Sequence, residues 1–311
     1  MELFHRYQGA LIGLAVGDSL GTTVEFSPPG SFAPISDIVG GGPFGLEPGQ
    51  WIDDTSMALC LAESLIECQG FDTGGQMQRY VRWWREGHLS STGDCFDIGN
   101  TVREALSAFE HSGNAISGST DPRSAGDGSL MRLAPVPLVY AQDPEMATWF
   151  AGERSKTTHG ATEAVDACRY FAGLIVGAIS GASKDELLAP NYCPVPDMWE
   201  QYPLVPGVGA VAAGSFRSKE PPEIRGTGYV VQSLEAALWS FNRSKNFREG
   251  ALLAVNLGED ADTTGVIYGQ IAGAYYGISG IPSQWRECIA RQETLTGYAG
   301  QLLTLSEHLR S

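Results

Sequence analysis

Along most of this chain, apolar and polar residues alternate with the spacing of amphipathic helices. The segment "DDTSMALCLAESLIECQG" (53–70) begins with acids and threonine, carries an apolar face and stops at a glycine, which is the usual order of signals along a helix. The same order recurs at 99–113, 161–180, 227–241 and 247–258. No stretch of useful length alternates strictly enough to predict a strand. The pattern therefore predicts a mostly α-helical protein.

Residues 189–227 break this pattern. Seven of the seventeen prolines fall in the segment, together with glycines and aromatic residues. Such composition is typical of irregular structure, and it predicts a surface excursion or a lid. Too few helix signals lie beyond the segment to define a second domain, so we expect one compact multi-helix domain over residues 1–311.

Two apolar segments carry glycine at every fourth position. The glycines stand at 9, 13, 17 and 21, and again at 265, 269, 273 and 277. On a helix this spacing forms a slowly drifting glycine face. Each internal glycine costs about 1 kcal/mol relative to alanine, so close helix packing must offset the loss. Asp18 and Glu25 border the first segment and Asp260 and Asp262 border the second, so these acids are expected to converge if both helices are central.

The composition and charge of the chain exclude some classes of binding partner. The formal charge is −16 and the pI is about 4.6, which argues against an extended nucleic-acid surface or an anionic membrane as partner. Local phosphate binding stays possible through metals and backbone N–H groups. The six cysteines show no CxxC spacing, and no apolar run reaches membrane-spanning length. We therefore expect reduced thiols in a cytoplasmic protein.

Acidic residues gather at two predicted helix starts. "GEDADTTG" contains Asp260, Asp262 and Thr263, and "WIDDTSMA" contains Asp53 and Asp54. An EF-hand is excluded because isoleucine stands where its terminal glutamate belongs, and N-capping accounts for only one acid of a pair. Oxygen-rich pairs without clustered histidine or cysteine favour Mg²⁺ or Mn²⁺ over zinc. The sequence thus predicts a hard-cation site, with room for two ions.

Two glycine-punctuated turns and one histidine are further candidates for ligand binding. "FDIGNTV" (96–102) and "SAGDGSLMR" (124–132) enter predicted helices, where backbone N–H groups can receive phosphate. Turns of this kind are more often simple helix caps. His159 in "TTHG" stands at another helix start, and a lone histidine is more often structural than catalytic.

The motifs, taken in order, resemble the ADP-ribosylglycohydrolase family. The resemblance rests on "GALIGLAVGDSLGTTVEF", "GQWIDDTSMA", "FDIGNT", "GDGSLMRLAPVPL", "THGATEA", "GYVVQSLEAALW" and "GEDADTTGVIYGQIAGAYYG". It spans roughly residues 6–280. It implies an all-α fold with two Mg²⁺ or Mn²⁺ ions, and a hydrolase that releases ADP-ribose from an ADP-ribosylated protein or small-molecule acceptor by cutting the glycosidic bond.

The resemblance also implies roles for individual residues. The metal ligands are Asp53, Asp54, Asp260, Asp262 and Thr263. The active-site residues near the scissile bond are Glu25 and, as a metal-bound carboxylate, Asp54. The residues implied to bind ADP-ribose are Asp97, Gly99, Gly126, Asp127, Gly128, Ser129, His159 and Tyr229, of which Tyr229 would stack on a ring.

This chain departs from the family pattern at two positions. Ile52 stands where the family usually has a threonine that ligates metal, so one ligand oxygen is missing. Asp127 replaces a usual asparagine and adds negative charge beside the expected pyrophosphate. These departures keep two alternatives open: an ADP-ribose-binding protein with an impaired metal centre, and a two-metal enzyme that cuts the pyrophosphate instead. The sequence leaves the acceptor open among arginine, serine, a nucleobase and others.

Overall fold

A computed structural model describes residues 2–309, and helices make up most of that range. The longer helices are α1 (Leu3–Gly21), α2 (Asp53–Glu67), α3 (Thr73–Glu86), α4 (Asn100–Ser112), α6 (Pro144–Ser155), α7 (Thr162–Ser180), α11 (Val230–Arg243), α12 (Phe247–Val255), α13 (Ala261–Tyr276) and α15 (Gln292–Leu309). The short ones are α5 (Pro135–Val139), α8 (Lys184–Leu187), α9 (Met198–Gln201), α10 (Pro206–Ala212) and α14 (Ser283–Cys288). Within the described residues β-pairing is limited to isolated bridges. The predicted all-α class is confirmed.

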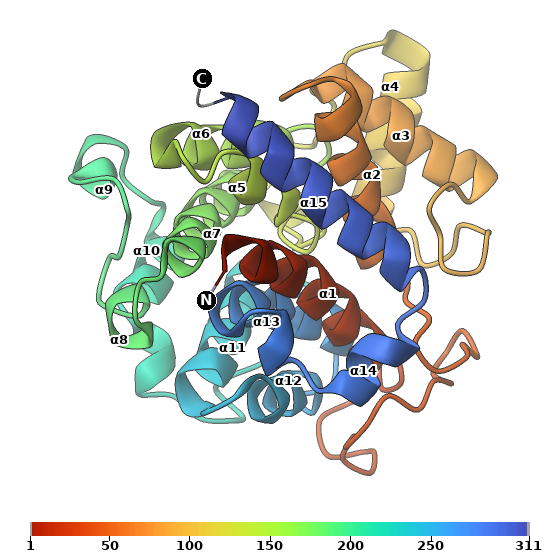
Figure 1. The fold of residues 1–311 in the computed structure, drawn as a ribbon, viewed down its shortest axis with the longest axis vertical. Helices are drawn as coiled ribbons and strands as arrows, with labels where there is room; N and C mark the ends of the chain where they lie inside the picture. The colour runs from red at the N-terminus through yellow and green to blue at the C-terminus, as the bar shows by residue number, and fades with distance from the viewer. Residues whose placement is uncertain (1, 310–311) are drawn as a thin grey trace.

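Helices α1 and α13 form the centre of the molecule and run antiparallel (Figure 1). Both are apolar around most of their circumference and almost wholly buried, as expected of core helices. Helix α15 lies across α1 and α2, while α11 and α12 pack against α13. Helices α5, α6 and α7 complete one side, and α2, α3 and α4 the other (Figure 1).

The spacing predicts close helix packing, and the two glycine faces are found to pack directly against each other. A Cβ added at Gly17 would lie 2.1 Å from the Gly265 carbonyl oxygen, and one at Gly9 would lie 2.1 Å from that of Gly273. No side chain fits between the two helices at these points. The contact brings the C-terminal end of α1 to the N-terminal end of α13, and the acids at the two ends therefore converge.

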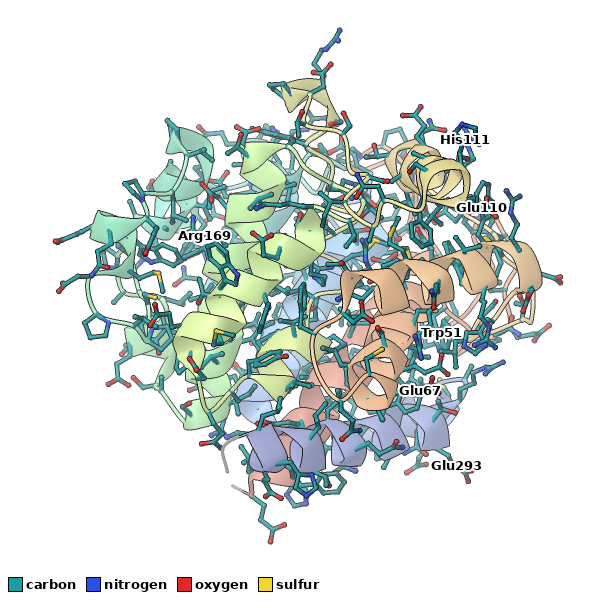
Figure 2. The ribbon with its side chains drawn as sticks, turned by 90° about the horizontal axis from the view of Figure 1, so that it is seen from above. Trp51, Glu67, Glu110, His111, Arg169 and Glu293 are labelled. Carbon is teal, nitrogen blue, oxygen red and sulfur yellow. The ribbon has the colours of Figure 1, made fainter. Side chains whose placement is uncertain are left out.

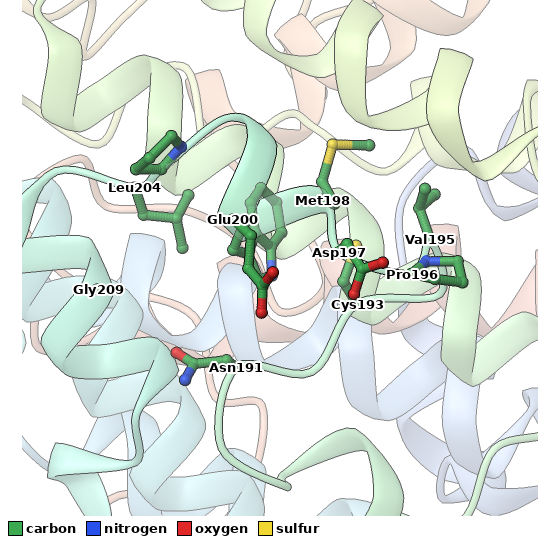
Figure 3. A pocket seen from close by; sticks show the side chains of 11 residues that line it. Asn191, Cys193, Val195, Pro196, Asp197, Met198, Glu200, Leu204 and Gly209 are labelled. Atoms are coloured by element: carbon green, nitrogen blue, oxygen red, sulfur yellow. The ribbon is translucent and has the colours of Figure 1, made fainter.

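The proline-rich segment 189–227 is more ordered than the sequence suggests. It contains α9, α10 and a 3₁₀ turn at Ser215–Arg217, which short proline-broken runs do not reveal by periodicity. Its residues line an open hollow of about 420 Å³, among them Asn191, Asp197 and, on α9, Glu200 (Figure 3). The segment thus forms a folded excursion at the side of the molecule.

Charged side chains occupy the outside of the bundle. Glu110 and His111 on α4 and Glu293 on α15 are exposed (Figure 2), whereas Trp51, just before α2, is completely buried. Over residues 2–309 the helices are too short or too polar to cross a bilayer. All six cysteines are free thiols.

Candidate active site

Most of the predicted site residues surround one cavity of about 560 Å³. The starts of α2, α4 and α13 meet there with the segment after α1 and the turn before α5. The predicted residues that line it are Glu25, Asp53, Asp97, Gly99, Gly126, Asp127, Gly128, His159, Asp260, Asp262 and Thr263. Three others, Asp54, Ser129 and Tyr229, adjoin the cavity's residues in the chain but do not themselves line it.

Asp18 fixes the start of α2 against α1. Its Oδ1 accepts from the Ile52 N–H at 3.0 Å, and its Oδ2 accepts from the Thr55 N–H at 3.0 Å and from Thr55 Oγ1 at 2.6 Å. A fully buried carboxylate therefore satisfies N–H groups at this helix start. The sequence marks Asp18 as one of the converging acids, and the structure shows that its oxygens are occupied. It positions Asp53 and Asp54.

The start of α13 supplies the opposite wall. The Asp260 N–H donates to the Gly226 carbonyl at 2.8 Å, which anchors this helix start to the end of the excursion. Thr263 Oγ1 donates to Asp54 Oδ1 at 3.1 Å, joining α13 to α2. The four aspartates and the threonine predicted to ligate metal thus come from two helix starts that are in direct contact.

Carboxylates crowd this cavity. One oxygen each from Glu25, Asp97 and Asp262 lies within 4.8 Å of the others. Burial, together with the charges of Asp97 and Asp53, raises the pKa of Glu25 to about 11. Burial first, and the charge of Asp97 next, raise the pKa of Asp53 well above its usual value. Burial raises the pKa of Asp97 to about 6, although its hydrogen bond with Glu25 lowers it. Like charges this close favour protonation unless positive charge is supplied.

The donor set fits divalent cations. Four buried carboxylate oxygens have no hydrogen-bond partner among residues 2–309: Glu25 Oε2, Asp54 Oδ2, Asp127 Oδ2 and Asp262 Oδ1. No lysine or arginine belongs to the described lining of the cavity. Buried charges are normally paired or coordinate metal, and clustered carboxylate and hydroxyl oxygens suit Mg²⁺ and Mn²⁺.

Two buried arginines support the glycine turn at 126–129 from behind. Arg132 donates to the Gly128 carbonyl, and Arg154 donates to the Ser129 carbonyl. Both guanidinium groups are fully buried, and neither has a carboxylate partner among the described ion pairs. The carbonyl of the Gly128–Ser129 peptide points toward Arg132, so its N–H, opposite in the trans peptide, points away from Arg132. The arginines also place positive charge behind a turn that suits phosphate.

His159 packs against the same turn. A Cβ added at Gly128 would lie 2.9 Å from the ring carbon Cε1, so only glycine lets the ring approach. The ring Nδ1 is 2.9 Å from Thr158 Oγ1. Burial, with the charges of Arg132 and Arg154, lowers the pKa of His159 to about 3. The ring is therefore neutral and can shape or contact a ligand, but it carries no proton to donate as an imidazolium.

Ser129 and Tyr229 take different places around the turn. The hydroxyl of Ser129 faces inward, 2.8 Å from Ser155 Oγ, and the whole residue is buried. Tyr229 is 39% exposed and its backbone pairs with Gly126. Its phenol donates to Glu163 Oε1 at 2.8 Å, which orients the ring beside the cavity rather than within its lining.

Ile52 occupies the position where a ligand hydroxyl was expected. It is the N-cap residue of α2 and only 1% exposed. Its backbone is fully engaged, with the N–H on Asp18 and the carbonyl accepting from Ser56 Oγ at 2.7 Å. Its side chain contributes no oxygen, so the set around Asp53 and Asp54 has one donor fewer than the family pattern.

Sequence reasoning missed several residues of the cavity. Those not named individually are Phe26, Asn100, Thr101, Val102, Met131, Thr227, Gly228 and Glu259. Four of them, Asn100, Thr101, Val102 and Met131, lie within the segments 96–102 and 124–132 that the sequence marks as candidates for ligand binding. Most are chain neighbours of predicted residues, and this adjacency is the sequence feature that could have identified them. The supporting arginines gave none, because a buried arginine without an acid is not suggested by any local pattern.

The all-helical bundle, the buried carboxylates and the glycine turn around one cavity are the features that the family resemblance implies for this class of hydrolase. The family model described as ADP-ribosylglycohydrolase matches residues 1–310, and the chain belongs to this family, whose members cleave the glycosidic bond between ADP-ribose and an acceptor.

Among its relatives are two proteins called ADP-ribosylarginine hydrolase Tri1. The one from Pseudomonas putida (strain GB-1) is 42% identical over 97% of this chain and 78% of its own length. The one from Serratia proteamaculans (strain 568) is 40% identical over 98% and 81%. A solved structure, titled ADP-ribosylglycohydrolase-related protein complex, superposes with a TM-score of 0.86 at 43% identity, over 98% of this chain and 99% of that one.

Proposed function

We propose that this protein hydrolyses ADP-ribosylarginine with the help of two divalent cations, Mg²⁺ or Mn²⁺. One observation carries the metal dependence: buried carboxylate oxygens without partners face a cavity whose described lining contains no cationic side chain. The names of the relatives at 40% and 42% identity support arginine as the acceptor. The enzyme would act on modified proteins or on smaller arginine conjugates.

The proposed cation ligands are Asp53, Asp54, Asp260, Asp262 and Thr263. They come from two contacting helix starts, and helix N-termini leave backbone N–H groups that balance carboxylate charge. Bound there, divalent cations supply positive charge that orders the ribose hydroxyls and makes a nearby water more acidic. The roles of these residues are the ones expected from the family resemblance.

ADP-ribose would lie along the cavity, with its phosphates at the glycine turns. In the turn at 126–129 the N–H groups of Gly126 and Asp127 donate to the carbonyls of Ser124 and Gly228. The N–H of Gly128 makes no hydrogen bond within the described residues and lies in front of the buried arginines, and Gly99 caps α4 at the other side. Oriented N–H groups and helix starts bind phosphate without a lysine. Asp127 faces the Asp260 end of the cavity, where burial and Asp260 raise its pKa, so its charge belongs with the acidic cluster. Tyr229 would stack on the adenine.

Glu25 is the proposed catalytic carboxylate. It lies in the cavity beside Asp97 and Asp262, and its charged form is favoured only where positive charge offsets its acidic neighbours. As a carboxylate it accepts a proton from the attacking water, whose oxygen bonds to the anomeric carbon. The bond from that carbon to the guanidine nitrogen breaks, and the nitrogen gains the proton that Glu25 took from the water, which returns Glu25 to its carboxylate form. Neighbouring carboxylates, including Asp54, stabilise the oxocarbenium-like state.

Mass spectrometry of released products tests this proposal. Peptides ADP-ribosylated on arginine or on serine are incubated with the protein plus chelator, Mg²⁺ or Mn²⁺. We expect free ADP-ribose and unmodified peptide from the arginine substrate, only when a cation is added. ADP-ribose binding by calorimetry without turnover would instead favour a binding protein, which the missing oxygen at Ile52 motivates. AMP as product would indicate cleavage of the pyrophosphate.

A further inference from the structure

Two residues at the mouth of the cavity have no role in the proposed reaction. Phe26 follows Glu25 in the chain, and Glu259 precedes Asp260; both line the cavity. Each has a left-handed backbone, with φ of 60° at Phe26 and 58° at Glu259. This conformation is uncommon for residues other than glycine, and such residues gather at functional sites.

Two backbone hydrogen bonds hold the segments that carry these two residues together. The Phe26 N–H donates to the Glu259 carbonyl at 2.7 Å, and the Glu259 N–H donates to the Ser27 carbonyl at 2.8 Å. The bonds join the segment after α1 to the segment before α13. Their two side chains are therefore displayed at one edge of the cavity, immediately next to the residues proposed to act on the anomeric carbon.

Both side chains are available to a ligand. Phe26 is 65% exposed, although phenylalanine is usually buried. The carboxylate of Glu259 is 22% exposed and pairs with the guanidinium of Arg225, with Arg225 Nε 3.3 Å from Glu259 Oε2. Arg225 is itself about half exposed, at 49%. At this edge of the cavity the Arg225 guanidinium is therefore already paired with the Glu259 carboxylate, in the segment that is hydrogen-bonded to exposed Phe26.

We propose that Phe26 and Glu259 form the acceptor subsite and recognise the ribosylated guanidinium of arginine. The inference rests on the proposed function and names the residues that select its acceptor. Glu259 pairs with the guanidinium and the Phe26 ring lies against its flat face, as carboxylates and aromatic rings do with arginine. Arg225 occupies the same carboxylate in the free enzyme and is displaced by substrate. A neutral acceptor such as serine gains nothing from either group.

Comparing the affinity for free ADP-ribose with the KM for the whole peptide substrate separates acceptor recognition from a structural role. Calorimetry gives the Kd of free ADP-ribose, and steady-state kinetics gives the KM of an ADP-ribosylarginine peptide. Glu259→Gln and Phe26→Ala should each raise the peptide KM by about three- to fivefold at low salt, while the Kd of ADP-ribose changes less than about twofold. The salt dependence of KM should weaken in Glu259→Gln, because an exposed ion pair is screened by salt. Arg225→Gln should lower the KM, because it frees the Glu259 carboxylate.

Two control variants remove comparable groups elsewhere. Glu287→Gln removes an exposed carboxylate and Tyr202→Ala an exposed ring, both outside the lining of the cavity; neither should change the KM. An unchanged KM in both Glu259→Gln and Phe26→Ala would overturn the subsite alone. So would equal losses in KM and ADP-ribose affinity, or a raised KM in Arg225→Gln. No release from the arginine peptide by the wild-type protein would overturn the proposed function, and the subsite with it.

Discussion

Replacement of Gly17 by alanine should separate the two central helices. The added Cβ would lie 2.1 Å from the Gly265 carbonyl oxygen and 2.7 Å from the Val266 nitrogen. Contacts below 3.0 Å essentially never occur for a real Cβ, and both neighbours are backbone atoms of a buried helix that cannot turn aside. Helix α1 must therefore move away from α13 by an ångström or so, close to Asp18 and Glu25 on one side and Asp262 on the other.

The expected cost follows from the size of the overlap. Inserting a methyl group into a filled core costs about 1–3 kcal/mol and occasionally more, and backbone on both sides places this position at the upper end. We expect a loss of about 3 kcal/mol in the free energy of unfolding, or a fall in Tm of about 5 °C. Gly297→Ala is the matched control, because nothing lies within 4 Å of its added Cβ in α15. That change should stabilise the protein by about 0.5–1 kcal/mol.

Chemical denaturation and ADP-ribose release, measured on both variants, decide the matter. Gly17→Ala should lose activity at temperatures where it is still folded, because the shift separates the acids contributed by α1 and α13. Gly297→Ala should keep full activity. A Gly17→Ala protein with wild-type stability and wild-type turnover would refute the argument that the glycine contact positions the site.

Four further results are expected. Asp260→Ala or Asp262→Ala should abolish turnover with the helical circular dichroism retained; a wild-type rate would remove them from the metal site. Glu25→Gln should slow hydrolysis far more than it weakens ADP-ribose binding, and the reverse would make Glu25 a binding residue. Ile52→Thr should raise turnover at low Mg²⁺ or Mn²⁺, whereas superimposable metal titrations would show that position 52 does not limit the site. In chelator, the free energy of unfolding should fall as pH rises through about 4–6 and beyond, because folded Glu25 and Asp97 keep protons that the unfolded chain releases; a rise over this range would contradict it.

The parts of the fold that could be predicted from the sequence are those that depend on residues close together in the chain. Helix starts such as Asp53 and the glycine spacing at Gly9–Gly21 depend on residues close in the chain, and both predictions are confirmed. The sequence predicted that Asp260 converges with the end of α1 if both glycine-striped helices are central, and the structure places both at the centre. The helices inside 189–227 were not predictable, since their stability comes from tertiary contacts that proline-broken runs do not display.

The parts of the site that could not be predicted depend on long-range contacts. Asp18 reads as one more acid near a metal, and only the structure shows its oxygens filled by the start of α2. Arg132 and Arg154 read as ordinary basic residues, yet both are buried behind the glycine turn. Phe26 and Glu259 differ from their neighbours in backbone conformation, which their residue types do not suggest.

The products formed from an arginine-linked ADP-ribosyl peptide test the central claim most directly. The peptide is incubated with wild-type protein in chelator and again in excess Mg²⁺ or Mn²⁺, and the masses of all products are recorded. Cation-dependent appearance of free ADP-ribose together with the unmodified peptide is the predicted result. Release of AMP with a ribose phosphate left on the peptide, or equal release of ADP-ribose in chelator, would contradict it.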